Sequence, residues 1–424
     1  MTLGRFIGII APMSQAPLEP SATQVFKHGF GLKKEVAEEL NRRYNDSRVV
    51  DYLRAHQNTL TIGNIRIYLA EEFGFCYGVD KAIDFAYETR RHFPDRRIFL
   101  TDEIIHNPRV NHELMEVGIQ FLSGSYAGNI GINDLTADDV VIFPAFGTTT
   151  MLEKELRNKG CVLVDTTCGS VVHVWKRVEK YAAEGFTAVI HGKFNHEETR
   201  ATSSRVLIVP EAKYVIVRDK EQAEAVCKYI ASGGNKEHFL VEFNGATSPG
   251  FDPDIDLERV GAANQTTMLA SESMEIAEML KRAVAARYGS SETDARFRSF
   301  DTICRATQDR QDALLKLRER KNINLFLVIG GYNSSNTSHL LEMAQSKSRA
   351  YHVQDATDLI SVNEIRHKPL SLSPCTDGDW IPEGSVNLGV TSGASTPNRV
   401  MEEVILRFLE LRGFSPAEIS ASLV

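Results

Sequence analysis

The chain has 424 residues, more than one hydrophobic core usually serves, so we expect two or three domains. Hydrophobic residues make up 42% and charged residues 25%, which excludes a collagenous, low-complexity or wholly disordered chain. Acidic residues outnumber basic ones by 56 to 48, a formal net charge of -8, so composition gives no support to a nucleic-acid surface that tracks phosphates.

The apolar segments are short. The longest, such as residues 326–329 and 140–143, have the size of β-strands, whereas a membrane-spanning helix needs about 18 apolar residues. We therefore expect no membrane crossing. Residues 1–24 carry one base, Arg5, and lack the charged start and clear cleavage site of a secretory signal. We interpret them as a loose leader and expect a cytoplasmic protein.

Residues 1–61 form a predicted N-terminal extension with helical patterns over 32–44 and 47–57. From about residue 62, apolar strand-like runs alternate with polar loops and amphipathic helices, which predicts α/β layers around mainly parallel sheets. We expect strands over 65–70, 97–100, 139–146, 162–165, 187–192, 213–217, 239–242, 325–331, 350–353 and 386–391. The helices expected between them cover 79–91, 151–160, 172–185, 273–289 and 310–320.

Three of the six cysteines share one context. Cys76, Cys168 and Cys304 each follow a strand-like run and precede a helix, and two of them end nearly the same string, DTTC at 165–168 and DTIC at 301–304. A helix amino terminus carries partial positive charge and free amides, which lower a thiol pKa and favour the thiolate needed for metal ligation or nucleophilic attack. The pattern predicts an internal structural repeat.

A single cysteine is most often a small buried hydrophobe, but three in one repeated context favour a shared site. Their separations, 92 residues from Cys76 to Cys168 and 136 from Cys168 to Cys304, exclude a local metal knuckle. A shared site therefore requires three α/β units to converge at the carboxyl ends of their strands, where open α/β sheets usually bind ligands. An iron-sulfur cluster held by three cysteines would leave one iron open to a substrate.

Other strand-to-helix junctions are rich in small polar side chains. Ser334, Ser335 and Asn336 precede one helix and Ser395 begins another, so both helix starts are candidate anion sites. Taken singly, ordinary helix capping is favoured about three to one over ligand binding.

Histidines also follow apolar runs, at His106, His191 and His196, and the last adjoins Glu197 and Glu198. A protonated histidine can pair with phosphate, and a carboxylic acid can deliver a proton to a leaving oxygen. The H-x4-H-E-E spacing follows a strand and a glycine and lacks the helix of an H-E-x-x-H metalloprotease, so we discount zinc hydrolysis.

Eight strings in fixed order resemble the 4-hydroxy-3-methylbut-2-enyl diphosphate reductase family, also called LytB or IspH, over roughly residues 63–408. They are GFCYGVDKAI, EIIHNPRV, DTTCGSV, GKFNHEET, NQTTML, DTICRATQDRQ, GGYNSSNTSHL and GVTSGASTP. The stretch GFGLKKEVAEELNRRY resembles the longer form of the enzyme found in cyanobacteria and plastids, which implies a cytoplasmic enzyme, or a plastid stroma enzyme in a eukaryote.

The resemblance implies three pseudo-symmetric α/β domains arranged as a trefoil around one central [4Fe-4S] cluster. We expect domains over 62–167, 168–303 and 304–400, followed by a C-terminal helix and tail over 401–424. By motif matching, Cys76, Cys168 and Cys304 hold the cluster, whose open iron faces the substrate hydroxyl group.

The resemblance also assigns roles around the cluster. Glu198 matches the proton-donating acid and Thr266 the threonine that orients the substrate, although Glu197 and Asn264 replace the usual proline and threonine of these motifs. The residues expected at the diphosphate are His106, His196, Gln265, Ser334, Ser335, Asn336 and Ser395.

The implied reaction is reductive dehydroxylation of the hydroxylated diphosphate to isopentenyl and dimethylallyl diphosphates, the last step of the non-mevalonate pathway. No G-x-G-x-x-G nicotinamide fingerprint follows a strand, so the electron donor is expected to be an external ferredoxin or flavodoxin.

One position departs from many bacterial members. They carry a histidine for the diphosphate where this chain has Phe146, as the longer members do. The lost charge-assisted hydrogen bond corresponds to about 1.5 to 3 kcal/mol unless another group replaces it. Thr148 and Thr149 are the candidates.

Two other function classes stay open at this point. A three-cysteine cluster protein that is a sensor or electron relay would not respond to substrate. A metal-free phosphate-binding α/β enzyme with buried structural cysteines would be colourless even when purified without oxygen.

Overall fold

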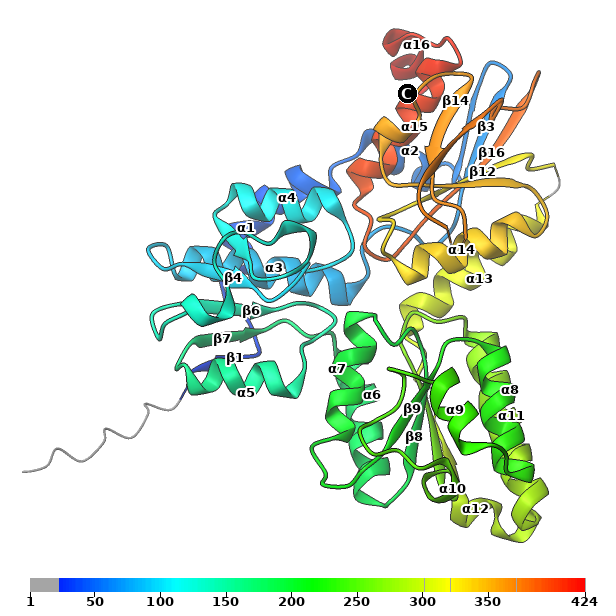
Figure 1. The fold of residues 1–424 in the computed structure, drawn as a ribbon. Helices are drawn as coiled ribbons and strands as arrows, with labels where there is room; N and C mark the ends of the chain where they lie inside the picture. The colour runs from blue at the N-terminus through cyan, green and yellow to red at the C-terminus, as the bar shows by residue number, and fades with distance from the viewer. Residues whose placement is uncertain (1–22, 301, 321, 371, 424) are drawn as a thin grey trace, which may run out of the picture.

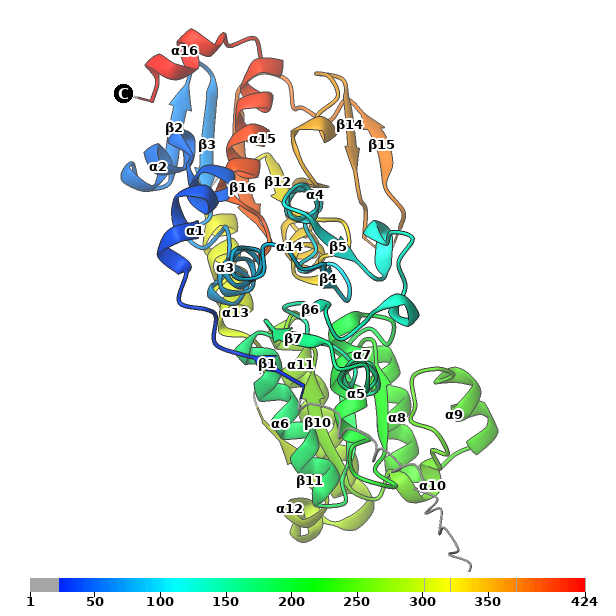
Figure 2. The same cartoon turned by 90° about the vertical axis from the view of Figure 1, so that its left-hand side faces the viewer.

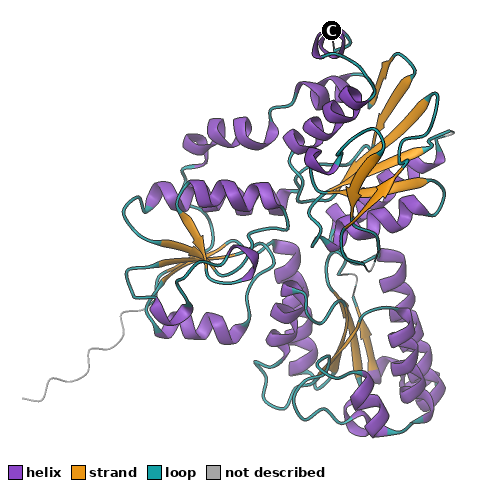
Figure 3. Cartoon of the chain, turned by 45° about the horizontal axis from the view of Figure 1, so that its top comes forward, coloured by secondary structure: helices purple, strands orange, loops and turns teal. Residues whose placement is uncertain are grey.

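The computed structural model describes residues 23–300, 302–320, 322–370 and 372–423. Three α/β lobes, each with a sheet between helices, surround a common centre (Figures 1 and 3). The predicted α/β class is confirmed. Most of the predicted leader, and Asp301 of the repeated DTIC string, lie outside the described residues. No helix within these ranges combines the length and the hydropathy that crossing a membrane takes.

The first lobe contains a parallel sheet with the strand order β1-β7-β6-β4-β5. All four residues of β6 are buried, as in a parallel sheet that helices cover on both faces. The strands are β1 (Val25–Phe26), β4 (Ile98–Leu100), β5 (Ile119–Phe121), β6 (Val140–Phe143) and β7 (Val162–Asp165). The helices are α1 (Lys33–Leu40), a π-helical turn (Asn41–Asn45), α3 (Tyr77–His92), α4 (Pro108–Glu116) and α5 (Thr150–Asn158), with 3-10 turns at Gly124–Tyr126 and Ile132–Asp134.

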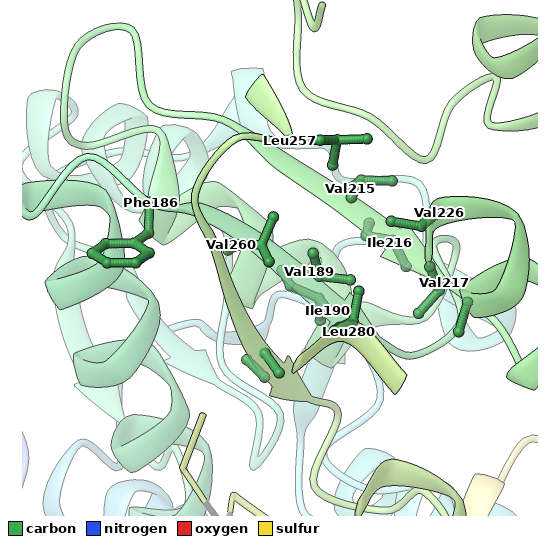
Figure 4. Close-up of a cluster of buried hydrophobic side chains, with 14 of the residues drawn as sticks. Phe186, Val189, Ile190, Val215, Ile216, Val217, Val226, Leu257, Val260 and Leu280 are labelled. Atoms are coloured by element: carbon green, nitrogen blue, oxygen red, sulfur yellow. The ribbon is translucent and has the colours of Figure 1, made fainter. Parts of the chain in front are cut away.

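The second lobe contains a parallel sheet with the order β11-β10-β8-β9. Apolar side chains of β8 and β9 meet those of the covering helices in one core (Figure 4). The strands are β8 (Thr187–His191), β9 (Tyr214–Val217), β10 (Val260–Asn264) and β11 (Phe297–Ser299). The helices are α6 (Gly169–Ala183), α7 (Glu197–Val206), α8 (Lys220–Ser232), α9 (Lys236–Glu242), α10 (Pro253–Asp256), α11 (Ala270–Tyr288) and α12 (Thr293–Arg296), with a 3-10 turn at Ser290–Glu292.

The third lobe has the order β13-β12-β16-β3-β2, in which only the pairing of β2 with β3 is antiparallel within the described strands. Its strands are β2 (Thr59–Ile62), β3 (Ile65–Leu69), β12 (Leu325–Ile329), β13 (Arg349–Val353) and β16 (Val386–Ser392), and β14 (Glu364–His367) and β15 (Cys375–Gly378) form a separate hairpin. Its helices are α2 (Arg48–Ala55), α13 (Arg305–Glu319), α14 (Ser335–Gln345), α15 (Asn398–Leu411) and α16 (Pro416–Ala421), with a 3-10 turn at Ala356–Asp358. Alternate residues of β12 enter separate cores on the two faces of the sheet.

Two local predictions fail in the second lobe. The stretch 239–242 is not a strand but the end of α9, which begins at the cap Asn235, whose side chain accepts a hydrogen bond from the amide of His238 at 2.9 Å. Conversely β10 was missed, because its sequence VGAAN is rich in residues that strands disfavour. Glycine is needed at Gly261, since a Cβ there would lie 2.6 Å from the ring of Tyr181.

The sheet membership of the first strands differs from the predicted division. The sequence predicts one domain over residues 62–167, but β3 pairs with β16 in the third sheet, from Ile65 opposite Val386 to Leu69 opposite Val390 (Figure 2). The predicted extension is likewise shared, since β1 pairs with β7 while α2 and β2 join the third lobe. The alternating burial of β3 indicates a strand, but the alternation says nothing about which sheet the strand joins.

The chain passes from one lobe to the next at each of three cysteines. Cys76 lies between β3 of the third sheet and α3, whose apolar face packs in the first lobe. Cys168 lies between β7 of the first sheet and α6 of the second lobe. Cys304 lies between β11 of the second sheet and α13 of the third lobe. The three passages bring cysteines that are distant in the sequence to the region where the lobes meet.

Leu280 of α11 is fully buried in the second-lobe core (Figure 4). We expect Leu280→Ala to lower the stability of this lobe by about 2 to 5 kcal/mol, because it removes buried methyl groups and leaves a cavity. Hydrogen exchange of the β8 and β10 amides measures this local stability. Met274→Ala on the same helix is the control, because Met274 is 61% exposed, and we expect a change within about 0.5 kcal/mol. Equal effects of the two substitutions would contradict this placement of Leu280.

Candidate functional site

The three cysteines at the lobe passages line one cavity. Cys76, Cys168 and Cys304 are the N-cap residues of α3, α6 and α13, so the predicted strand, cysteine, helix order is confirmed at all three. A Cβ on Gly78 would lie 2.5 Å from Sγ of Cys168 and 3.9 Å from Sγ of Cys76, so both sulfurs flank this glycine. Ser170, which sequence reasoning did not single out, donates a hydrogen bond to Sγ of Cys304 at 3.5 Å.

Burial disfavours the thiolate form of two of the three cysteines, Cys76 and Cys168. It raises the pKa of Cys76, outweighing the backbone amides of Val79 and Gly78 and the nearby Arg310 guanidinium. It also raises the pKa of Cys168 in spite of the Ser170 amide. The predicted lowering of the thiol pKa is therefore wrong for these two residues, because desolvation of the thiolate exceeds the helix-terminus effect. A cation bound between the sulfurs would reverse that balance.

Glu198, in the first turn of α7, is a fully buried carboxyl group that lines the same cavity. Its Oε1 accepts a hydrogen bond from the Thr266 amide at 2.6 Å. Its Oε2 has no hydrogen-bond partner among the described residues. Burial raises the pKa of Glu198 to about 7. Near neutral pH this carboxyl group can therefore hold and release a proton, as general acid catalysis requires.

Two buried histidines meet beside Glu198 in the same cavity. Nε2 of His106 lies 3.2 Å from Nε2 of His196, and Nδ1 of His196 accepts a hydrogen bond from the Glu198 amide at 3.2 Å, which caps α7. Burial lowers the pKa of His196 well below its usual value. The ring of Phe146 stacks on His106 with centroids 4.4 Å apart.

Small polar residues of the third lobe complete the cavity. Ser334 caps α14, with Oγ accepting from the Thr337 amide at 3.2 Å, and Ser335 and Asn336 follow in the first turn. Ser395 donates a hydrogen bond to the backbone oxygen of His106 at 3.4 Å. All four line the cavity. The free amides of a helix first turn beside such side chains suit an anion.

The remaining candidates lie farther back. Gln265 contacts the site through Ser335, to whose Oγ it donates at 3.3 Å. Thr148 and Thr149, the predicted substitutes for a histidine, line a separate surface cavity, and Thr149 caps α5 through the Leu152 amide. His191 is the last residue of β8, and its Nδ1 lies 2.8 Å from Oγ of Ser273 on α11. A residue's place in a motif does not report where its side chain points, so the sequence could not separate these residues from those that line the cavity.

A second cavity reaches the cysteines from another side. It is lined by Cys76, Cys168 and Cys304 together with Phe73, Arg305 and Arg310, among others, and Tyr77 at its edge is 83% exposed. Sequence reasoning missed this feature, because it depends on how the lobes meet. All three cysteines thus line both cavities, and none of the residues predicted to bind the diphosphate lines the second one.

Comparison with known proteins shows similarity over most of the chain. Residues 67–409 match the family model described as LytB protein. A relative from Gloeobacter violaceus, named 4-hydroxy-3-methylbut-2-enyl diphosphate reductase, is 48% identical over 393 residues, which cover 92% of this chain and 93% of the relative. One of the same name from Synechococcus sp. (strain CC9605) is 47% identical over 388 residues, covering 91% and 95%.

A solved structure has the same fold. It is described as the E-1-hydroxy-2-methyl-but-2-enyl-4-diphosphate reductase from Plasmodium falciparum, and it aligns with a TM-score of 0.59 at 22% identity. The alignment covers 83% of this chain and 89% of that one.

The raised pKa of Glu198 predicts that its carboxyl group loses its proton near pH 7. As the pH rises through about 7, the fraction of protonated carboxyl should fall, because burial disfavours the carboxylate until that pH. Infrared difference spectra, with Glu198→Gln as the reference that lacks this group, should show the protonated carboxyl band disappear with a midpoint near that value. A midpoint near the ordinary 4.5 would contradict the assignment.

Proposed function

The chain belongs to the LytB protein family, and on that premise we propose that it reduces (E)-4-hydroxy-3-methylbut-2-enyl diphosphate to isopentenyl diphosphate and dimethylallyl diphosphate, the last step of the non-mevalonate isoprenoid pathway. One observation carries the proposal. Three cysteines, a buried acid and a set of small polar groups at a helix start line the same cavity. These are the groups needed for a metal centre, a proton donor and an anion site.

The residues present fit a [4Fe-4S] cluster. Three soft thiol ligands converge from three lobes. Any side chain at position 78 would collide with the sulfur of Cys168, and Gly78 leaves that space free. Cys76, Cys168 and Cys304 would be its ligands, one cluster per chain. When bound, such a cluster supplies electrons one at a time and an open Lewis-acid iron for the substrate hydroxyl group.

The reaction needs two electrons and two protons. The carbon-oxygen bond of the substrate breaks, the oxygen leaves as water after gaining a proton, and the five-carbon fragment accepts the two supplied electrons and takes up a second proton. Glu198 is suited to deliver the proton to the leaving oxygen, because its pKa of about 7 makes it a usable acid near neutrality. The Thr266 amide holds Oε1, so Oε2 is the oxygen left to face a substrate.

The diphosphate is bound away from the reacting end. We assign it to Ser334, Ser335, Asn336 and Ser395 with the two histidines, and we assign Gln265 to holding Ser335. Binding energy at this remote group orients the hydroxyl end, so loss of a cradle residue should affect turnover as well as affinity.

Electrons must arrive from outside, and we propose ferredoxin or flavodoxin as the donor. The second cavity supports an external donor, since it reaches the three cysteines by a route separate from the diphosphate residues. All six cysteines, which lie within the described residues, are free thiols, which suits a reducing compartment such as the cytoplasm or plastid stroma.

The test is an assay after anaerobic purification. We expect the protein to convert the hydroxylated diphosphate to five-carbon products when a chemical reductant is added. Glu198→Gln should retain iron and substrate affinity but lower turnover by about 10² to 10⁴, because the amide cannot donate the proton. Product analysis by mass spectrometry and equilibrium binding measure the two effects. An iron-containing protein that does not convert the substrate would support an electron relay. A colourless protein would support a metal-free enzyme.

Removal of one ligand should disrupt the metal centre. We expect Cys168→Ser to lose most iron and acid-labile sulfide per chain. Cys227→Ser makes the same chemical change on α8, away from the cavity, and should keep the wild-type content. Anaerobic iron and sulfide analysis measures both. Unchanged iron in Cys168→Ser would assign the ligand elsewhere.

A further inference from the structure

One backbone amide determines where the protons lie on the two cavity histidines. The Glu198 N-H can only donate, and it donates to Nδ1 of His196 at 3.2 Å. A neutral imidazole carries one N-H, and burial keeps His196 neutral by lowering its pKa. The proton of His196 is therefore on Nε2.

The neighbouring ring must then accept. Nε2 of His106 lies 3.2 Å from Nε2 of His196, so the His106 proton lies on the other nitrogen, Nδ1. That nitrogen faces Oε2 of Glu103 at 3.1 Å, to which it donates. The side chains of His106 and Glu103 are only 8% and 12% exposed. Glu103 thus holds His106 in the tautomer that presents a lone pair toward His196.

In this tautomer His106 cannot bind an anion through Nε2, because that nitrogen carries a lone pair and no proton. A diphosphate oxygen at Nε2 of His106 requires a donor there. A neutral tautomer switch would place the Nδ1 lone pair against the Glu103 carboxylate, which is repulsive. Protonation instead makes both nitrogens donors, with Glu103 as the counter-ion on one side and the diphosphate on the other. The stacked Phe146 ring adds favourable contact with a cationic imidazole.

We propose that Glu103 is a positioning residue of the diphosphate site, which makes ligand binding at His106 proceed with uptake of one proton from solvent. The inference rests on the proposed function. The step forms an imidazolium between a carboxylate and a diphosphate, and no other covalent bond is made or broken.

Other charged groups face His106 from neighbouring elements. Glu197 Oε2 lies 3.7 Å from Nε2 of His106, with its side chain 35% exposed. It stands on the side that the diphosphate must occupy, so it opposes the anion rather than assisting it. His196 and Glu198 line the same cavity as His106. A neighbouring cavity, lined by His106 and Glu103, also contains Lys368, Tyr126 and Tyr332.

Calorimetry of the anaerobic holoenzyme tests the inference. Binding of 4-hydroxy-3-methylbut-2-enyl diphosphate without reductant is measured near neutral pH in buffers of different ionisation enthalpy, which gives the protons taken up per ligand. We expect wild type to take up about one proton more than Glu103→Gln, whose amide also permits the other tautomer. The ligand's own protonation cancels in this difference. Glu116→Gln, an exposed carboxylate on α4, is the matched control and should behave as wild type.

Two further variants and the pH dependence of KM test the same inference. His106→Asn, which has no titratable ring, should give the same proton count as Glu103→Gln, while Glu197→Gln should keep the wild-type count. In turnover, KM of wild type should rise with pH, whereas Glu103→Gln should show a KM raised on the order of tenfold near neutrality and a weaker pH dependence.

Two results overturn the inference alone: equal proton uptake in wild type and in Glu103→Gln or His106→Asn, or loss of uptake in Glu197→Gln instead. Failure of wild type to bind the substrate overturns the proposed function, and this inference with it.

Discussion

Convergence of three partly buried thiols at the points where the chain changes lobes is the constraint on which the rest of the structure depends. Each of Cys76, Cys168 and Cys304 belongs to one lobe by the strand before it and to another by the helix after it. The cavity they line therefore exists only when all three lobes are packed together. Burial raises the pKa of Cys76 and Cys168 and so disfavours their thiolates, and a cationic centre held between the sulfurs would stabilise them.

The same desolvation suppresses charge of either sign across the cavity. It raises the pKa of Glu198 to about 7 and lowers that of His196, so an acid stays partly protonated and a base stays neutral within a few ångströms of each other. The cavity has few fixed charges of its own. The hydrogen bond from the Glu198 amide to His196 determines which ring nitrogen of His106 carries its proton.

Features encoded next to each other in the chain were predictable from sequence. The strand, cysteine, helix junctions and the polar start of α14 are local patterns, and the structure contains them. What depended on distant packing was not predictable. The partner strand of β3 and the pKa of Cys76 follow from neighbours that no short window contains. The helical state of residues 239–242 has a local signal, the cap at Asn235, which lies just outside the apolar run. Glu103 stood inside a recognised string, but its importance depends on a tautomer that begins at the amide of Glu198.

The ladder between β3 and β16 has a topological consequence. Both the early segment of α2, β2 and β3 and the late segment of β16 and α15 belong to the third lobe, so the chain visits the other two lobes and returns (Figure 2). The ring of lobes is thus closed by strand pairing instead of a covalent bond. Separation of these two strands would open the ring while leaving every peptide bond intact, and α3 alone would then hold Cys76, seven residues beyond β3, near the other two cysteines.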